Sequence, residues 1–93
     1  MARQTFASVW DAVEEDPADA ANMRARSAVM IALRERIEHW RGGPAKAAKR
    51  VGLTQRRLDD LMRGRLDKFT LDELMNLAQA AGLGVRVEID AAA

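Results

Sequence analysis

The 93-residue chain has no cysteine, no tyrosine and one histidine, and its only aromatic residues are two Trp and two Phe. Without cysteine it can form no disulfide, thiolate zinc site or cysteine nucleophile. The single His39 leaves no set of residues for acid–base or metal chemistry, so we expect no enzyme, catalytic residue, metal or cofactor. So few aromatic rings also argue against single-strand or RNA binding by base stacking.

Long uncharged apolar runs are also missing, so we expect no membrane span and no membrane partner. The N-terminal stretch has no apolar signal segment ahead of its acidic run. The sequence therefore predicts a cytoplasmic protein.

Net charge of either sign is nearly absent, because 15 Lys and Arg oppose 14 Asp and Glu. The charge is nevertheless segregated along the chain. Residues 41–68 carry nine basic and three acidic residues, residues 1–40 carry five and seven, and residues 69–93 carry one and four. A basic segment suited to DNA thus lies between two acidic ends, either of which suits a basic protein partner.

The chain is long enough for one domain, and we expect residues 1–93 to form it. Residues 1–16 form an N-terminal segment whose large apolar residues predict a short amphipathic helix (Phe6, Val9, Trp10, Val13). Pro17 then begins a long helix that runs to about His39. Its apolar stripe is interrupted by Arg26, whose aliphatic stem can lie along the same face (Met23, Met30, Leu33, Ile37, Trp40).

Three shorter helices follow, marked by their capping residues. One runs from Pro44 to the terminator Gly52, and Thr54 caps the next, which ends at Gly64. Thr70 and Glu73 have the spacing of a capping box that starts the last helix, which ends at Gly82. The helix count predicts an all-α, five-helix domain.

The period of the apolar residues changes to two near the C-terminus, at Leu83, Val85, Val87 and Ile89. This alternation predicts a single β-strand over residues 83–89. A lone strand needs a partner, which is either the N-terminal segment or a second molecule. We favour pairing across a symmetric homodimer, with these four residues as the dimerisation contacts.

Residues 44–63 have the spacing of a helix-turn-helix, whose second helix enters the major groove of DNA. Ala48 is small where the second helix crosses, and Gly52 supplies the turn. Four apolar residues fill the wedge between the helices (Val51, Leu53, Leu58, Leu61).

The stretch AKAAKRVGLTQRRLDDLMRG resembles the DNA-binding unit of the lambda-repressor-like (XRE) family. With FASVWDAVEEDPADAANMRARS before it and RGRLDKFTLDELMNLAQAAGLGVRVEI after it, nearly the whole chain resembles the HigA-type antitoxins. The resemblance implies a dimeric repressor that binds double-stranded operator DNA and neutralises a RelE-like ribonuclease toxin. Two alternatives stay open: a free-standing XRE-type repressor, and a protein-interaction module with a degenerate helix-turn-helix.

One departure from the family concerns the start of the first motif helix. Family members carry Leu-Thr-Gln there and use the Gln side chain to contact phosphate, whereas this chain has Gly42-Gly43-Pro44. Backbone N–H groups at this helix start remain able to bind a phosphate.

By position, the resemblance makes six residues candidates for reading bases (Thr54, Gln55, Arg56, Asp59, Asp60, Arg63). Gln55 suits adenine and Arg56 suits guanine. For the acids we favour ion pairs along the helix, Arg56 with Asp60 and Asp59 with Arg63, over contacts to cytosine. Six further cations are candidates for phosphate contacts (Lys46, Lys49, Arg50, Arg57, Arg65, Lys68).

Overall fold

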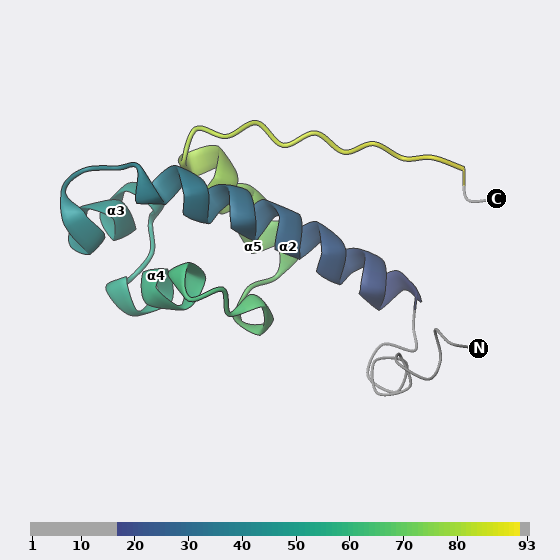
Figure 1. Ribbon diagram of the computed structural model, residues 1–93, viewed down its shortest axis with the longest axis horizontal. Helices are drawn as coiled ribbons and strands as arrows, with labels where there is room; N and C mark the ends of the chain where they lie inside the picture. The colour runs from purple at the N-terminus through teal and green to yellow at the C-terminus, as the bar shows by residue number, and fades with distance from the viewer. Residues whose placement is uncertain (1–16, 92–93) are drawn as a thin grey trace.

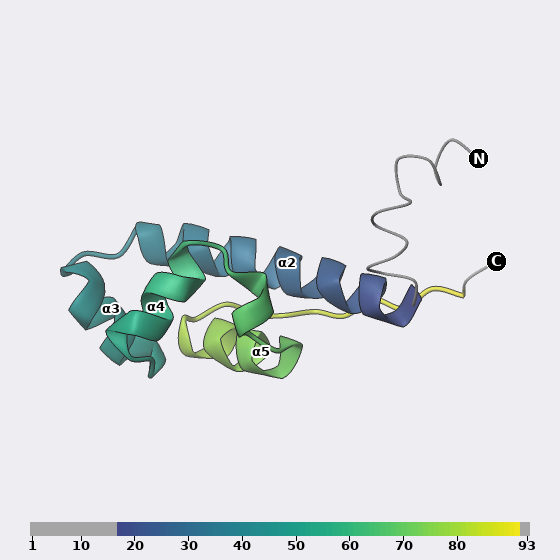
Figure 2. The ribbon, with the colours of Figure 1, turned by 90° about the horizontal axis from the view of Figure 1, so that it is seen from below.

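Four α-helices and one turn of 3₁₀-helix make up residues 17–91, the part of the chain that this computed structural model describes. They are α2 (Pro17–Glu38), α3 (Gly43–Val51), α4 (Gln55–Met62), η1 (Leu66–Lys68) and α5 (Leu71–Ala80). The longest is α2, and the shorter helices gather on one side of it toward its C-terminal end (Figures 1 and 2). No helix in this range is both long and apolar enough to cross a membrane.

The predicted all-α class is confirmed, and four of the five expected helices lie in residues 17–91. The helix expected around Phe6, Val9, Trp10 and Val13 lies outside the described residues, so the count of five is not supported. The turn η1 was not predicted, because three residues are too few to show a helical period.

The core lies between the C-terminal half of α2 and the four shorter elements. Leu33, Leu61 and Leu74 are fully buried at its centre. Each leucine removed from water in this way stabilises the fold by about 2 kcal/mol. The remaining buried members come from α2, α3, α4, α5 and the loops beside them (Met30, Ile37, Ala47, Ala48, Val51, Leu58, Phe69, Leu77, Ala78, Ala81).

Local signals in the sequence correctly predict how the short helices begin and end. Gly52 ends α3 with a φ of 79°, a left-handed conformation that glycine adopts without strain. The Thr54 side chain accepts a hydrogen bond from the backbone N–H of Arg57 at the start of α4. At the start of α5, Thr70 and Glu73 form the predicted capping box in both directions.

Two arginines of α2 hold the loops of the shorter elements. The guanidinium of Arg26 donates to the carbonyl oxygens of Leu66, the first residue of η1, and of Phe69, the residue after η1, at 3.2 and 3.3 Å. Arg36 donates to the carbonyl oxygens of Ala81 and Gly82, at 3.1 and 3.4 Å, just beyond α5. The carbonyls of Ala81 and Gly82 follow the last turn of α5 and have no donor within it, so Arg36 satisfies them and attaches α5 to α2. Arg26 attaches η1 to α2 in the same way.

The C-terminal segment differs from the prediction. Leu83 packs against the core, and the chain then runs on as an extended tail that draws away from α2 (Figure 1). Within residues 17–91 no strand forms, so the β-strand expected over 83–89 is not supported. The physical reason is that a strand needs a neighbouring backbone to accept its hydrogen bonds, and the described chain offers none.

Candidate nucleic-acid interface

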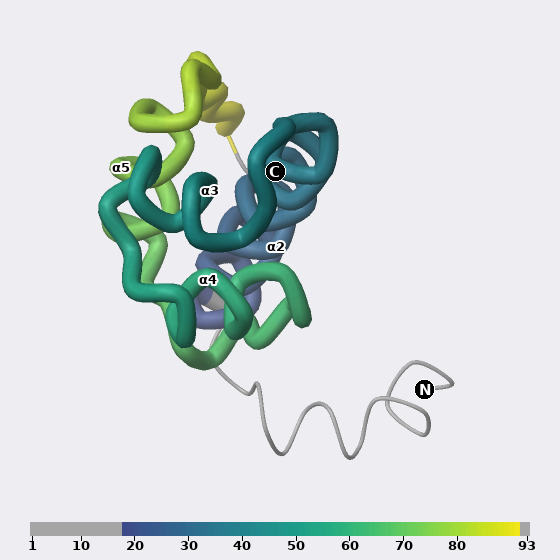
Figure 3. The backbone as a smooth tube through the Cα atoms, turned by 90° about the vertical axis from the view of Figure 1, so that its left-hand side faces the viewer, coloured from purple at the N-terminus to yellow at the C-terminus, as the bar shows by residue number. Residues whose placement is uncertain are grey.

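The pair α3 and α4 forms a helix–turn–helix at one end of the molecule (Figure 3). After the turn at Gly52, the N–H of Leu53 donates to the carbonyl oxygen of Ala48 at 2.9 Å, which draws the chain back across α3. Ala48 is 2% exposed, so a larger side chain there would displace its neighbours. The small residue is therefore required by packing, as its position in the sequence predicts.

Polar side chains occupy the outward face of α4. Gln55, Asp59 and Arg63 follow one another at intervals of four residues, which places them in one row, and all three are exposed. Asp59 and Arg63 form the predicted ion pair, with Arg63 Nε 3.0 Å from Asp59 Oδ2. Arg56 is exposed beside this row, and neither it nor the side chain of Gln55 has a polar partner among residues 17–91.

A family model described as a helix-turn-helix domain matches residues 12–91. The chain belongs to this helix-turn-helix family. The match places it, at a coarse level, among DNA-binding regulators of the XRE-like kind. No curated protein matches the sequence.

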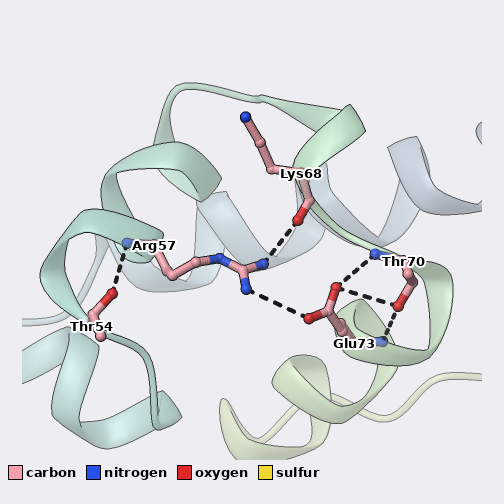
Figure 4. Close-up of polar contacts among 5 residues, drawn as sticks. All are labelled: Thr54, Arg57, Lys68, Thr70 and Glu73. Carbon is pink, nitrogen blue, oxygen red and sulfur yellow. Dashed lines mark hydrogen bonds and ion pairs between the residues drawn. The ribbon is translucent and has the colours of Figure 1, made fainter.

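Within this helix-turn-helix protein, Arg57 does not face outward with Arg56. Its guanidinium crosses from α4 to the loop before α5, where Nη2 donates to the carbonyl oxygen of Lys68 at 2.9 Å (Figure 4). Nη1 lies 3.6 Å from Glu73 Oε2, and the guanidinium carbon lies 4.4 Å from the centre of the Phe69 ring. We call these three contacts the Arg57 clasp.

One contact of the clasp, the ion pair with Arg57, depends on the charge of Glu73. The pKa of Glu73 is lowered, chiefly by the hydrogen bond from the backbone N–H of Thr70. Burial opposes this as the second-largest effect, and the charge of Arg57 lowers the pKa further. The ionised carboxylate therefore serves the capping box of α5 and the clasp at once. This use of Arg57 within the fold argues against its predicted role as a phosphate contact.

The ion pair predicted between Arg56 and Asp60 does not form. Asp60 pairs with Arg65 at 3.7 Å rather than with Arg56, and its side chain is only 17% exposed. The Arg65 N–H donates to the Asp60 carbonyl oxygen, so the turn after α4 brings Arg65 beside Asp60. Asp60 is thereby turned toward the loop and away from the row that Gln55 begins.

The helix-turn-helix protein carries a further group of cations on α3. Lys46, Lys49 and Arg50 are exposed, and none of them pairs with a carboxylate in the described part of the chain. The guanidinium of Arg50 lies 4.0 Å from the centre of the Trp40 ring, a cation–π contact that positions it and keeps its charge. Lys68 is exposed on η1, and only its carbonyl oxygen takes part in the clasp.

The start of α3 has no side-chain cap. Gly42 has a φ of 105° and lies so close to Lys46 that a Cβ there would clash with the lysine side chain. The N–H groups of this helix start therefore have no side-chain acceptor, in keeping with the missing Gln. These N–H groups therefore remain open to a phosphate acceptor, in addition to the exposed lysines and Arg50 of α3.

The sequence did not predict the contacts that Arg26, Arg36 and Arg57 make with carbonyl oxygens. Each arginine meets residues that are distant along the chain: 40 or more positions for Arg26 and Arg36, and 11 for Arg57 and Lys68. No local spacing signals such a contact. The apolar stripe that Arg26 interrupts was the one available sign that this arginine is partly buried.

Proposed function

We propose that the protein is a homodimeric transcriptional repressor that binds a specific sequence of double-stranded DNA through α4. The observation that carries the proposal is the outward face of α4, where Gln55 and Arg56 are exposed and held by no other described residue. Side chains that read bases must be free to contact them, and buried or clasped residues are not.

In this proposal Arg56 donates two hydrogen bonds to a guanine, and Gln55 pairs with an adenine. Asp59 holds Arg63 in position beside them through the 3.0 Å ion pair. Thr54 lies at the edge of the base-reading group, since its hydroxyl already caps α4. Asp60 and Arg57 are left out because both are held within the fold.

Phosphate contacts come from the cations that flank this face. Lys46, Lys49, Arg50 and Lys68 have no ion pair among residues 17–91, and Arg65 is partly neutralised by Asp60. These contacts orient the protein on DNA without reading sequence. To read two half-sites, a homodimer formed through Leu83, Val85, Val87 and Ile89 has to hold its two α4 helices about 34 Å apart, one turn of DNA.

We further propose that the repressor is the antitoxin of a toxin–antitoxin module, with a RelE-like ribonuclease as its protein partner. The resemblance of nearly the whole chain to HigA-type antitoxins supports this role. The charge pattern supports it as well, because the segments on both sides of the basic stretch are acidic. A basic nuclease can therefore meet an acidic end while α4 remains available for DNA.

The DNA-binding test starts by selecting duplexes from a random library with the full-length protein. Fluorescence anisotropy then compares the selected duplex with a scrambled one at several salt concentrations. The four cations per protomer without an ion pair among the described residues (Lys46, Lys49, Arg50, Lys68) make eight phosphate contacts in a dimer. They predict a slope of about −7 when the logarithm of the association constant is plotted against the logarithm of the salt concentration. A flat salt dependence, or no duplex binding at low salt, would support the interaction-module alternative instead.

A matched pair of variants separates the two kinds of contact. Arg56→Ala should cost about 1–3 kcal/mol at one base position and leave the other positions unchanged. Lys49→Ala should weaken selected and scrambled duplexes alike and reduce the salt slope by about one for each protomer. A uniform loss in Arg56→Ala would reassign Arg56 to a phosphate.

The antitoxin role is tested through the neighbouring reading frame. Expression of a small basic nuclease encoded beside this gene should arrest growth, and co-expression of the present chain should restore it. Co-purification of the two proteins provides the direct readout. Failure of both leaves the free-standing repressor as the function.

A further inference from the structure

The tail beyond Leu83 exposes apolar side chains that nothing in residues 17–91 covers. Val85 is 40% exposed, Val87 68% and Ile89 89%, so exposure rises with distance from the core. The backbone of this segment forms no ladder with any described strand. Unpaired N–H and C=O groups beside exposed apolar side chains favour pairing with another chain.

A surface that can support such a pair lies beside the tail on α2. Ala28, Ile31 and Ala32 are exposed on one face of this helix, and Ile31 is 51% exposed. A shallow hollow of about 180 Å³ separates Ala28 and Ala32 from Leu83 and Val85. The tail starts close to the C-terminal half of α2 and draws away from the helix toward the C-terminus (Figure 1). A pair of strands alone is only marginally stable in water. Packing of its apolar side against an apolar helix face would stabilise it.

The charges of the tail select one way of pairing two copies. In an antiparallel pair, directly opposite residues point to the same side of the ribbon. The apolar residues of the tail alternate with other residues, so they face apolar residues of the second copy only when the twofold axis passes through a residue and not between two residues. An axis at Arg86 opposes two arginines, and an axis at Glu88 opposes two glutamates although it also sets Arg86 opposite Asp90. An axis at Val85 forms no pair of opposite charges. An axis at Val87 places Arg86 opposite Glu88 of the second copy, twice, and Val85 opposite its Ile89.

We propose that two copies of the chain pair their tails as antiparallel strands with Val87 on the twofold axis. The two Arg86–Glu88 pairs lie on one side of the ribbon, and its apolar side lies against α2 around Ile31. Arg86 and Glu88 already project on the same side of the single tail, where their charged groups are 3.8 Å apart. The proposal rests on the homodimer proposed above and specifies its contact.

Disulfide trapping tests the register directly, because the native chain contains no cysteine. Three full-length variants are compared under mild oxidation: Val87→Cys, Arg86→Cys and Glu88→Cys. Opposite residues in an antiparallel pair have Cα atoms about 4.5–5.5 Å apart, within disulfide range, whereas diagonal neighbours are about 7–8 Å apart. We expect Val87→Cys to cross-link with itself. The other two should cross-link only when mixed with each other.

Self-cross-linking of Arg86→Cys or Glu88→Cys, without that of Val87→Cys, would assign a different axis and overturn the register. Absence of any cross-link, in a chain that sedimentation shows to be a monomer, would overturn the dimer through the tail. Operator binding by anisotropy is read separately. Retained DNA binding without cross-links refutes the tail pairing alone, and cross-links without DNA binding refute the operator proposal alone.

Charge reversal is a second test that needs no oxidation. Arg86→Glu and Glu88→Arg should each weaken dimerisation by about tenfold, because each turns two attractive cross-strand pairs into repulsive ones. Mixing the two variants should restore the native affinity in a heterodimer, and so should the double reversal in one chain. Equal dimerisation of both single variants and the native chain would contradict the pairing.

Discussion

Arg56 and Arg57 are neighbours in sequence, and the structure predicts opposite effects when each is replaced by alanine. Arg57→Ala removes the hydrogen bond to Lys68, the ion pair with Glu73 and the contact with the Phe69 ring. A charged hydrogen bond to a carbonyl, partly exposed to solvent, contributes about 1 kcal/mol. The ion pair contributes about 0.5 kcal/mol because both side chains are more than a third exposed, and the cation–π contact contributes a similar amount. The expected loss of unfolding free energy is therefore about 2 kcal/mol.

Arg56→Ala is the matched control. Its side chain is exposed and has no polar partner among the described residues, so its removal should change the unfolding free energy by less than about 0.5 kcal/mol. Urea denaturation followed by circular dichroism measures both variants. All samples are held at one protein concentration, since dimerisation makes apparent stability depend on concentration.

Arg57→Lys tests the geometry of the clasp. Lysine keeps the charge and loses the planar guanidinium that donates to Lys68 while lying over Phe69, so we expect about half of the alanine effect. The reasoning would be refuted by an Arg57→Ala variant as stable as the native chain, or by equal losses in Arg56→Ala and Arg57→Ala. The second result would show that α4 is held by both arginines.

Two further stability predictions follow from the helix ends. Because the pKa of Glu73 is lowered in the folded state, the stability that its charge provides is complete above the ordinary value of 4.5 and is lost as the pH falls below that value. The native chain should therefore lose more unfolding free energy than Glu73→Gln between about pH 5 and pH 3, and parallel pH profiles in urea titrations would contradict this. Gly52→Ala should cost about 1 kcal/mol, since alanine is strained at a φ of 79° although its Cβ would meet no neighbour. A thermal melt unchanged from that of the native chain would show that the turn relaxes without cost.

Features set by residues close in sequence were predictable, as α4 shows. Thr54 caps it, Gly52 ends the helix before it, and Asp59 pairs with Arg63 one turn later. The pairing of Arg56 with Asp60 had the same spacing and failed. Asp60 instead meets Arg65, which the turn after α4 brings back toward it. The spacing of Arg56 and Asp60 along one helix does not reveal a second arginine that the folded chain brings to the same carboxylate.

The C-terminal segment shows a second limit. Alternation of Leu83, Val85, Val87 and Ile89 describes the side chains of a strand, and the segment is extended, yet no strand forms within residues 17–91. The pattern predicts that the segment is extended, but it does not predict which backbone pairs with it. Its partner has to be argued from charge, as in the register centred on Val87.

The fold also changes how the basic segment should be interpreted. Its nine Lys and Arg residues suggest a broad positive surface, but Arg57 is clasped and Arg63 and Arg65 are paired with acids. Three of the six cations without such partners lie on α3 (Lys46, Lys49, Arg50), while α4 presents Gln55 and Arg56. Affinity that depends on salt should then come mostly from α3 and discrimination between bases from α4. Because α3 lacks the Gln that related proteins carry, its phosphate contacts have to come from its side-chain cations and from the backbone N–H groups at its start. Loss of Lys49 should therefore matter more here than in a protein that keeps the Gln.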